Sequence, residues 1–501
     1  MKINKYILEI SVFICGAVVM VFELVGSRVL APYFGTSIYV WTSLIGIILG
    51  SLSLGYFLGG KVSDKRPRLN HLALIIFLSG AIIGFTILFK DPLLTFMFTK
   101  IDNIKVGSVA ASLIIFTPAS ILLGMVSPYA AKLKIKSLDS SGSIVGNLYA
   151  ISTTGSIVGT FLSGFYLIPR FGTNKLLFIL AATLLAVSAA LTGKKFINQK
   201  VFVLAIFLLG WLIADRFSSF FMLKKEGVID VDTGYNRIWI YDYQDQKTKN
   251  NIRVMSMNSI VHSLMALNKN ELAEGEVEYY VKYYHLASYF NANFKKTLML
   301  GGAGYSYPKD YLRKYPSATI DVVEIDPMTT ELARKYFNLK ENPRLRIFHE
   351  DGRVYLNRTS ESYDAIFIDA FTSTNSVPYQ LTTRESVKKE YDILNDNGIV
   401  IVNLISSIEG KNGRFLRAQY KTYKSLFPQV YLFSVNDIDD GSQVQNFILT
   451  ALKSNEPQSF KSEDPDLNEY LGRLWKKEII EDMPIITDDY APVDSYISNI
   501  I

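Results

Sequence analysis

Seven long apolar segments within the first 222 residues constrain the fold of this chain more than any other feature. A helix needs about 20 mostly apolar residues to cross a hydrocarbon core of roughly 30 Å. We predict membrane spans at residues 7–30, 38–60, 70–89, 107–131, 143–168, 173–192 and 201–222. Glycine pairs at four-residue spacing, such as Gly55 with Gly59 and Gly155 with Gly159, favour close helix packing. Residues 1–222 are therefore predicted to form an α-helical transmembrane bundle of about seven spans, in a multi-pass protein of the cell membrane.

The charge balance divides the chain at the same place. Residues 1–222 hold 19 Lys and Arg against 7 Asp and Glu, a net charge of +12, whereas residues 223–501 hold 33 against 39, a net charge of −6. This division is typical of a membrane anchor followed by a soluble domain that attracts cations, and it excludes a nucleic-acid binder with a basic face. Basic clusters precede the first span and follow the second, fourth and sixth, and the positive-inside rule makes these cytoplasmic. An odd number of spans then puts the soluble domain outside. The loops on the opposite side also carry Lys and Arg, so the charge bias is moderate and the side of the soluble domain stays open.

The second half of the chain alternates strands and helices. Apolar and polar residues alternate between 228 and 262, which predicts a small antiparallel β-sheet in a subdomain at 223–270. A helix is predicted at 271–292. Further strands are predicted at about 297–301, 319–325, 344–348, 364–369, 398–405 and 444–452. Short all-apolar runs in these strands suit burial on both faces, so residues 271–501 are predicted to form an α/β domain with a doubly wound parallel sheet.

The first two strands of this sheet end in residues suited to a nucleoside. Ligands of doubly wound sheets bind beyond the carboxyl ends of the strands. The first strand runs into a small-residue turn that contains Gly301 and Gly302, although a tight turn needs glycine in any case. The second strand ends near Glu324, whose carboxylate can accept hydrogen bonds from both hydroxyls of a ribose.

The next two strands also end in carboxylates. Asp351, followed by Gly352, can accept a hydrogen bond from an adenine amino group or merely cap the next helix. Asp369 follows the fourth strand, at a position suited to a general base. Ligand-type residues at four successive strand ends together indicate a nucleoside site with a catalytic carboxylate.

These residues, taken together, resemble the spermidine/spermine synthase family of polyamine aminopropyltransferases. The resemblance is closest to members in which about seven membrane spans precede the synthase domain. The matching stretches in the first half are FELVGSRVLAPYFG (22–35), LGYFLGGKVSD (54–64) and GNLYAISTTGSIVGTFLSGF (146–165). Those in the second half are LGGAG (300–304), VEID (323–326), EDGR (350–353), YDAIFIDAF (363–371) and TDDYAPV (487–493). The resemblance implies a Rossmann-like, class I methyltransferase-type fold and transfer of an aminopropyl group to putrescine or a related amine.

The resemblance also implies a role for each matching residue. Its donor is decarboxylated S-adenosylmethionine, a co-substrate, with no other cofactor and no metal. The donor-binding residues that it implies are Gly301, Gly302, Glu324, Asp351 and Gly352, with His262 at the edge of the donor site. Asp369 matches the base that deprotonates the acceptor amine, and Tyr279 matches a tyrosine that helps to hold the substrates. Asp488 and Asp489 are further candidates for binding an amine.

The expected partners are these polyamine and nucleoside sulfonium substrates, the lipid bilayer and a second copy of the chain in a homodimer, with no nucleic acid. The four histidines lack metal-ligand spacing, and the single cysteine excludes a disulfide framework. Two positions depart from the family pattern, because Gly304 and Thr372 stand where the family has acids that bind amines. Two alternatives therefore stay open: a methyltransferase that uses intact S-adenosylmethionine, and a non-catalytic membrane sensor or transporter that binds a nucleoside or polyamine.

Overall fold

The computed structural model describes most of the chain, in two compact units. The described residues are 6–101, 103–135, 137, 140–192, 227–246, 249–258, 260–267, 277–370 and 377–497. One unit comprises Met1–Gly227 with Val231–Asn236, and the other comprises Val228–Asp230 with Arg237–Ile501.

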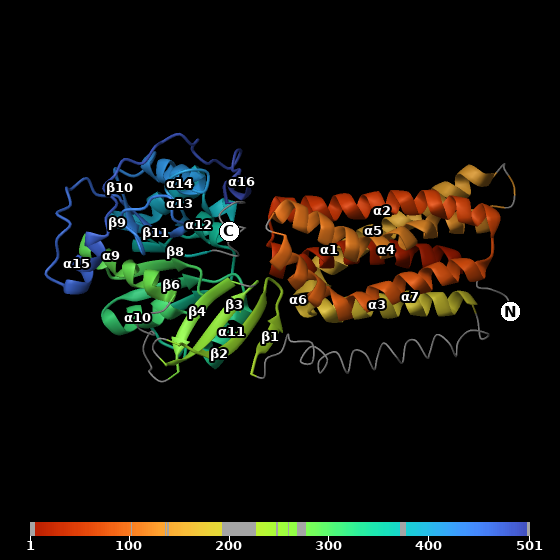
Figure 1. Cartoon of the computed structure of the whole chain (residues 1–501), viewed down its shortest axis with the longest axis horizontal. Helices are drawn as coiled ribbons and strands as arrows, with labels where there is room; N and C mark the ends of the chain where they lie inside the picture. The colour runs from red at the N-terminus through yellow and green to blue at the C-terminus, as the bar shows by residue number, and fades with distance from the viewer. Residues whose placement is uncertain are drawn as a thin grey trace. The chain divides into compact units, whose positions relative to one another are not determined.

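The first unit is helical (Figure 1). Its long helices are α1 (Ile7–Phe34), α2 (Ile38–Lys65), α3 (Leu69–Lys100), α4 (Ile104–Lys134), α5 (Ser141–Leu162) and α7 (Thr173–Thr192), and α5 continues through the π-helical turn η2 (Ser163–Leu167) into α6 (Ile168–Arg170). Five of them, α1 to α4 and α7, are long and apolar enough to cross a membrane. The predicted span at 143–168 is helical but is less apolar, because α5 is rich in Ser, Thr and Gly. The predicted span at 201–222 lies outside the described residues.

Glycines let the helices of this unit approach closely. A Cβ atom on Gly55 of α2 would overlap the carbonyl oxygen of Ile121 on α4. One on Gly159 of α5 would overlap the carbonyl oxygen of Ala17 on α1. Van der Waals packing of this kind drives helix association where lipid surrounds the helices, since lipid tails are as apolar as the side chains. These two pairs thus pack as their spacing predicts. The prediction is wrong for a third pair with the same spacing, Gly46 with Gly50 on α2, where a Cβ atom would meet nothing within 4 Å.

The second unit begins with a four-stranded sheet and a short helical segment. The sheet has the order β1-β2-β3-β4, and its strands are β1 (Ile229–Asp232), β2 (Arg237–Gln244), β3 (Asn251–Met257) and β4 (Ile260–Ala266). After residues that lie outside the described ranges come the 3₁₀ helix η4 (Val277–His285) and the short helix α9 (Leu286–Phe290). The single helix predicted at 271–292 therefore does not form as one element. Its run of tyrosines has low helix propensity, and Tyr283 and Tyr284 are fully buried by tertiary packing.

A seven-stranded sheet follows, with the order β10-β11-β9-β8-β5-β6-β7. Its strands are β5 (Lys296–Leu300), β6 (Thr319–Val323), β7 (Leu345–Phe348), β8 (Tyr363–Ile368), β9 (Leu394–Ser406), β10 (Gln429–Ser434) and β11 (Gln445–Leu452). The first five in the chain are parallel, whereas β11 runs antiparallel to both β9 and β10. The strand order reverses between β5 and β8, which is where doubly wound sheets bind ligands.

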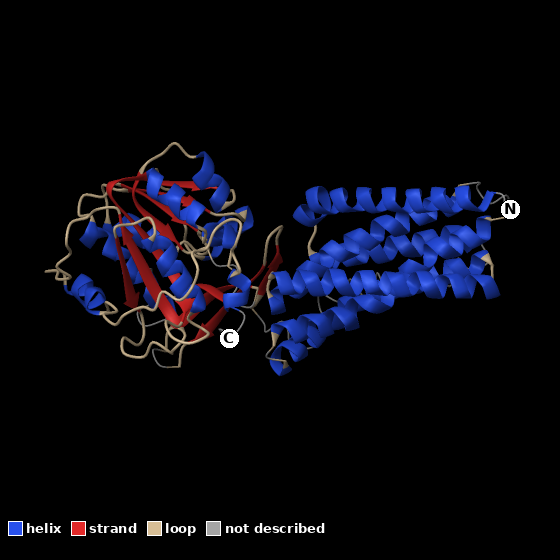
Figure 2. Cartoon of the chain, turned by 90° about the horizontal axis from the view of Figure 1, so that it is seen from above, coloured by secondary structure: helices blue, strands red, loops and turns tan. Residues whose placement is uncertain are grey.

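Helices cover both faces of this sheet, as Figure 2 shows for the strands drawn in red. Alternate strand residues enter different cores: Leu298 and Ile366 pack in one, and Met299 and Phe367 in the other. The helices are α10 (Ser306–Lys314), α11 (Pro327–Tyr336), α12 (Gly352–Arg358), η5 (Tyr379–Leu381), α13 (Arg384–Ile393), α14 (Arg414–Lys424), α15 (Pro465–Gly472) and α16 (Val493–Ile497). The unit is therefore the Rossmann-like α/β domain that the sequence predicts. The prediction of a wholly parallel sheet is wrong, because the strand predicted at 444–452 is β11, which runs antiparallel to its neighbours.

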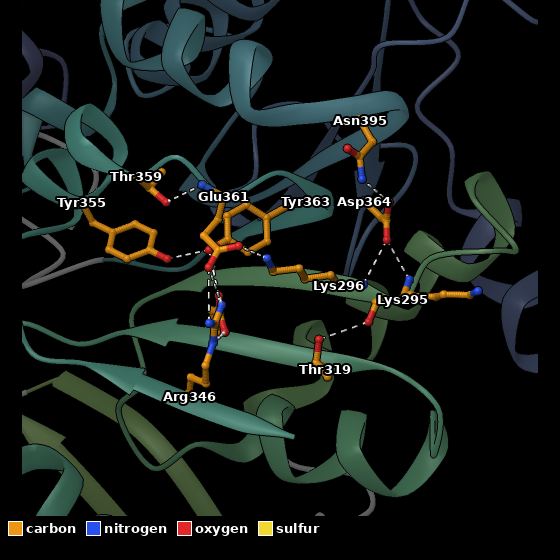
Figure 3. A network of polar contacts seen from close by, with 11 residues as sticks. Lys295, Lys296, Thr319, Arg346, Tyr355, Thr359, Glu361, Tyr363, Asp364 and Asn395 are labelled. Carbon is orange, nitrogen blue, oxygen red and sulfur yellow. Dashed lines mark hydrogen bonds and ion pairs between the residues drawn. The ribbon is translucent and has the colours of Figure 1, made fainter. Parts of the chain in front are cut away.

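A polar network ties the amino-terminal edge of the parallel strands together (Figure 3). The buried Asp321 accepts hydrogen bonds from Arg346 Nε at 2.7 Å and from Tyr363 Oη at 2.8 Å. Asp364 Oδ2 accepts the backbone N–H of Lys296 at 2.9 Å. These contacts join β5, β6, β7 and β8 at the edge opposite the one where Glu324, Asp351 and Asp369 follow their strands.

Candidate active site

The turn after β5 has a backbone that suits glycine. Gly301 has a φ of +96°, and a Cβ atom there would overlap the carbonyl oxygen of Asp369. Ala303 and Tyr305 also have positive φ values, +44° and +56°, which non-glycine residues rarely adopt. Burial of the Tyr305 ring and a 2.7 Å hydrogen bond between its hydroxyl and Thr330 Oγ1 hold this conformation. The turn is therefore a rigid stretch of backbone beside the end of β8.

Glu324 organises this turn from the end of β6. Its Oε2 accepts the backbone N–H groups of Gly302 at 2.9 Å and Ala303 at 3.2 Å, and its Oε1 accepts that of Asp326 at 3.0 Å. Burial raises the pKa of Glu324, and these three hydrogen bonds oppose the rise. Oε2 already accepts two of these bonds, whereas Oε1 accepts one, so the acceptor site that remains for a ribose hydroxyl is on Oε1.

Asp351 caps the helix that follows β7. Its Oδ1 accepts the backbone N–H groups of Arg353 at 2.8 Å and Val354 at 3.1 Å, as the capping interpretation of the sequence expects. Its Oδ2 makes no hydrogen bond to the residues that the structure describes. Gly352 is the first residue of α12, and a Cβ atom there would lie 3.4 Å from the side chain of Leu381. The predicted contact of Asp351 with adenine would use Oδ2.

Asp369 follows β8 and is partly buried at this edge. Its Oδ2 accepts a hydrogen bond from Tyr280 Oη at 3.0 Å, and its Oδ1 accepts one from Asn403 Nδ2 at 3.1 Å. Burial raises the pKa of Asp369, while these hydrogen bonds and the nearby His262 lower it. The hydroxyl of Tyr284 is fully buried near this carboxylate and does not meet the geometry of a hydrogen bond to any described residue. A carboxylate whose pKa is raised by burial is suited to taking up a proton.

Tyr279 is the tyrosine that the family resemblance implies, and two of these neighbours of Asp369 are not predicted from the sequence. Tyr279 lies on η4, but its side chain is outside the described part of the structure, and it is Tyr280 whose hydroxyl contacts Asp369. Asn403 was also missed, although a lone amide in the apolar run of β9 is a signal that could have drawn attention to it. His262, on β4, has Nδ1 at 2.9 Å from the carbonyl oxygen of Ile260 and is close enough to act on Asp369.

The two C-terminal acids occupy an exposed segment. Asp488 accepts hydrogen bonds from Arg353 Nη2 at 2.8 Å and from Thr383 Oγ1 at 2.7 Å, so both of its carboxylate oxygens have protein partners. Asp489 is exposed and makes no hydrogen bond or ion pair within the described residues. The contacts of Asp488 attach the C-terminal segment to α12 and to the start of α13, which gives this residue a structural explanation.

Gly304 is closed off by packing. Its backbone N–H donates to Ser263 Oγ at 2.8 Å, and a Cβ atom at 304 would lie 2.6 Å from the Cβ atom of Ser263 on β4. An acidic side chain does not fit at this position unless β4 moves. Thr372, the second position that departs from the family pattern, lies outside the described residues.

The second unit is a Rossmann-like domain in which the glycine turn and the acids at the ends of β6 and β8 lie at the switch point of the strand order, where doubly wound sheets bind ligands. Residues 277–437 match the spermine/spermidine synthase domain family. The chain is 29% identical over 170 residues to the polyamine aminopropyltransferase of Vibrio vulnificus, covering 33% of this chain and 54% of that protein. It is 24% identical over 416 residues to polyamine aminopropyltransferase 2 of Aquifex aeolicus, covering 79% of this chain and 78% of that protein.

Among solved structures, a probable spermidine synthase from Corynebacterium glutamicum is similar at 20% identity and a TM-score of 0.43, over 51% of this chain and 92% of that chain. Residues 277–437 match a spermine/spermidine synthase domain, and similarity to polyamine aminopropyltransferases extends over most of the chain. The family resemblance is confirmed. The chain spans about half the length of the Vibrio vulnificus relative.

Proposed function

We propose that this protein is a membrane-anchored polyamine aminopropyltransferase. It transfers the aminopropyl group of decarboxylated S-adenosylmethionine to putrescine or a related amine. The observation that carries the proposal is Asp369, an enclosed carboxylate with a raised pKa beside the glycine turn of a spermine/spermidine synthase domain. We assign the anchor to residues 1–222 with about seven spans, the small sheet to 223–270 and the transferase domain to 271–501.

The proposed reaction is a displacement at carbon. The acceptor nitrogen attacks the methylene carbon next to the sulfonium, a nitrogen–carbon bond forms, and the carbon–sulfur bond breaks. The sulfur keeps the electron pair and leaves as a neutral thioether, so the step balances without a redox partner. An alkylamine is almost wholly protonated at pH 7, so its proton must pass to a base as attack begins. Asp369 takes that proton in our account.

The donor takes the positions that the family resemblance implies. The backbone of Gly301 and Gly302 approaches it closely, Glu324 accepts hydrogen bonds from its ribose, and Asp351 with Gly352 lies beside its adenine. Tyr279 and His262 border the donor and acceptor. We assign Asp488 a structural role, because Arg353 and Thr383 occupy its two carboxylate oxygens. The exposed Asp489 is the remaining candidate for binding an incoming amine.

Methyl transfer from intact S-adenosylmethionine is the second candidate. The contact between Gly304 and Ser263 favours it, because this chain lacks the acid that would pair with the free amine of a decarboxylated donor. Against it, the described groups around Asp369 are a carboxylate, two tyrosines, an asparagine and a histidine, with no guanidinium or ammonium that would bind a donor carboxylate.

Substitution of Asp369 by Asn tests the proposed base. The purified Asp369→Asn protein should bind the donor with wild-type affinity by calorimetry but should form no measurable product from putrescine. An unchanged rate of product formation would refute the role of Asp369.

The location and assembly of the protein belong to the same proposal. We place the protein in the cell membrane with its first 222 residues in the bilayer, and cysteine labelling from either side of sealed vesicles would locate the soluble domain. The homodimer that the resemblance implies is tested by the mass of the detergent-solubilised protein in light scattering.

A further inference from the structure

A buried amide, that of Asn403, lies in the middle of the large sheet and contacts the proposed base. Asn403 lies in β9, within an otherwise apolar run, and its side chain is 2% exposed. Moving an amide from water into an apolar medium without hydrogen bonds costs several kcal/mol. A buried amide is therefore expected to have hydrogen-bond partners on both its oxygen and its nitrogen. Those partners show what the residue does.

Asn403 is the centre of a chain of hydrogen bonds that crosses three strands. Asn446 Nδ2, on β11, donates to Asn403 Oδ1 at 2.8 Å. Asn403 Nδ2 donates in turn to Asp369 Oδ1 at 3.1 Å, at the end of β8. The register of β11 and β9 pairs Asn446 with Ile405 and Ile448 with Asn403, so the two asparagines are diagonal neighbours on one face of the sheet.

The direction of these bonds is fixed by chemistry. An ionised carboxylate accepts hydrogen bonds and donates none, so Asn403 must turn its NH₂ group toward Asp369. Its carbonyl oxygen then faces Asn446 and requires a donor there. Asn446 supplies that donor and thereby holds the amide of Asn403 in the orientation that serves Asp369.

The other groups that act on Asp369 come from two elements. Among the described residues they are Tyr280 and Tyr284 on η4 and His262 on β4. Tyr280 donates to Oδ2, so Asn403 and Tyr280 hold the two oxygens separately. Burial raises the pKa of Asp369, and the hydrogen bond from Asn403 is the largest of the opposing effects.

We infer that Asn403 is a positioning residue that orients Asp369 and keeps it ionised, and that Asn446 sets the direction of the Asn403 amide. This inference rests on the proposed function, in which Asp369 is the base. Without the donor from Asn403, Asp369 binds its proton more tightly and is unavailable as a base at low pH.

The test compares four variants of the full-length protein in detergent. Asn403→Leu removes the donor and keeps the number and branching of the heavy atoms in the side chain. Asn446→Leu removes only the residue that orients it, and Asn446→Asp offers a carboxylate that draws the Asn403 NH₂ group away from Asp369. Asn395→Leu is the matched control, because Asn395 Nδ2 donates to Asp364 at 2.6 Å at the opposite edge of the sheet (Figure 3).

The readout is the pH profile of kcat/KM for product formation from putrescine and decarboxylated donor. We expect the acidic limb of Asn403→Leu to move up by about one pH unit, a roughly tenfold loss below that limb, with recovery at high pH. Asn446→Asp should move the acidic limb at least as far, and Asn446→Leu should move it less far. Asn395→Leu should leave the acidic limb at the wild-type pH. A limb that stays at the wild-type pH in Asn403→Leu and Asn446→Asp overturns the inference.

A second readout does not require turnover. The protonated-carboxyl band that is absent from Asp369→Asn identifies Asp369 in infrared pH titrations, and its midpoint should rise in Asn403→Leu and in Asn446→Asp. If the wild-type protein forms no product, the proposed function fails, while the infrared midpoints still decide the inference. If Asn403→Leu does not fold, the two Asn446 variants decide the inference. It predicts a higher infrared midpoint for Asp369 in Asn446→Asp than in Asn446→Leu, and equal midpoints in the two variants overturn it.

Discussion

Glu390 makes the stability of the soluble unit depend on pH. It lies on α13, is fully buried, and accepts hydrogen bonds from Tyr423 Oη at 2.7 Å and from Ser386 Oγ at 3.3 Å. Burial raises its pKa from 4.5 to about 7, and the hydrogen bonds from Tyr423 and Ser386 offset only part of that rise. The folded chain therefore binds a proton at Glu390 more tightly than the unfolded chain does.

The sign and size of the effect follow from this difference. The contribution of Glu390 to stability is fully present below pH 4.5 and is lost as the pH rises through about 7. Each unit of pKa corresponds to about 1.36 kcal/mol, so the loss amounts to about 3 kcal/mol by pH 8. Gln has the shape of Glu without its charge, so Glu390→Gln should be more stable than the wild type by up to that amount at pH 8 and nearly equal to it at pH 4.5.

Urea titrations of the full-length protein in detergent, followed by tryptophan fluorescence at several pH values, measure this difference. Glu331→Gln is the control, because Glu331 is exposed on α11, and its curve should parallel that of the wild type. A free energy of unfolding for Glu390→Gln that stays below the wild-type value at pH 8 would show that the buried carboxylate is not destabilised by ionisation.

Three further substitutions test the site. Gly301→Ala forces a Cβ atom into the carbonyl of Asp369 at a φ of +96°, so kcat/KM for product formation should fall by about 100-fold, and a wild-type value would contradict the assigned turn geometry. Gly304→Asp should lower the free energy of unfolding, measured in urea, by about 1–3 kcal/mol. Adding Ser263→Gly to this variant should restore much of the lost stability. If the two substitutions instead lower the stability additively, the contact between positions 304 and 263 is contradicted. Asp488→Asn should cost no more than about 1 kcal/mol of stability and leave the KM for putrescine unchanged, whereas a raised KM would return this residue to the substrate site.

Much of the α/β domain could be predicted from sequence because its strands are short, mostly apolar runs bounded by polar residues or glycine. The predicted strands at 297–301, 344–348 and 364–369 lie within one residue of β5, β7 and β8. The strand β10 was missed because it lies at the edge of the sheet and its first residues are only partly buried, so its pattern is weak. Local propensity also does not show that the tyrosine run at 277–285 forms a 3₁₀ helix, since tertiary packing decides it.

The candidate site was predicted in part for a similar reason. Residues at the ends of parallel strands must meet at one edge, so Glu324, Asp351 and Asp369 could be named from the strand pattern alone. Contacts made across the sheet could not be named, because the pairing of Asn403 with Asp369 depends on strand order. The contact of the Tyr280 hydroxyl with Asp369 could not be named either, because it depends on the rotation of η4.

The most direct test of the proposed function is product analysis by mass spectrometry with the purified full-length protein, putrescine, and either decarboxylated or intact S-adenosylmethionine. Our account predicts spermidine and a released thioether nucleoside from the decarboxylated donor, and no product from the intact one. Methylated amine from the intact donor, or no product from either, would contradict the proposal that this protein is an aminopropyltransferase.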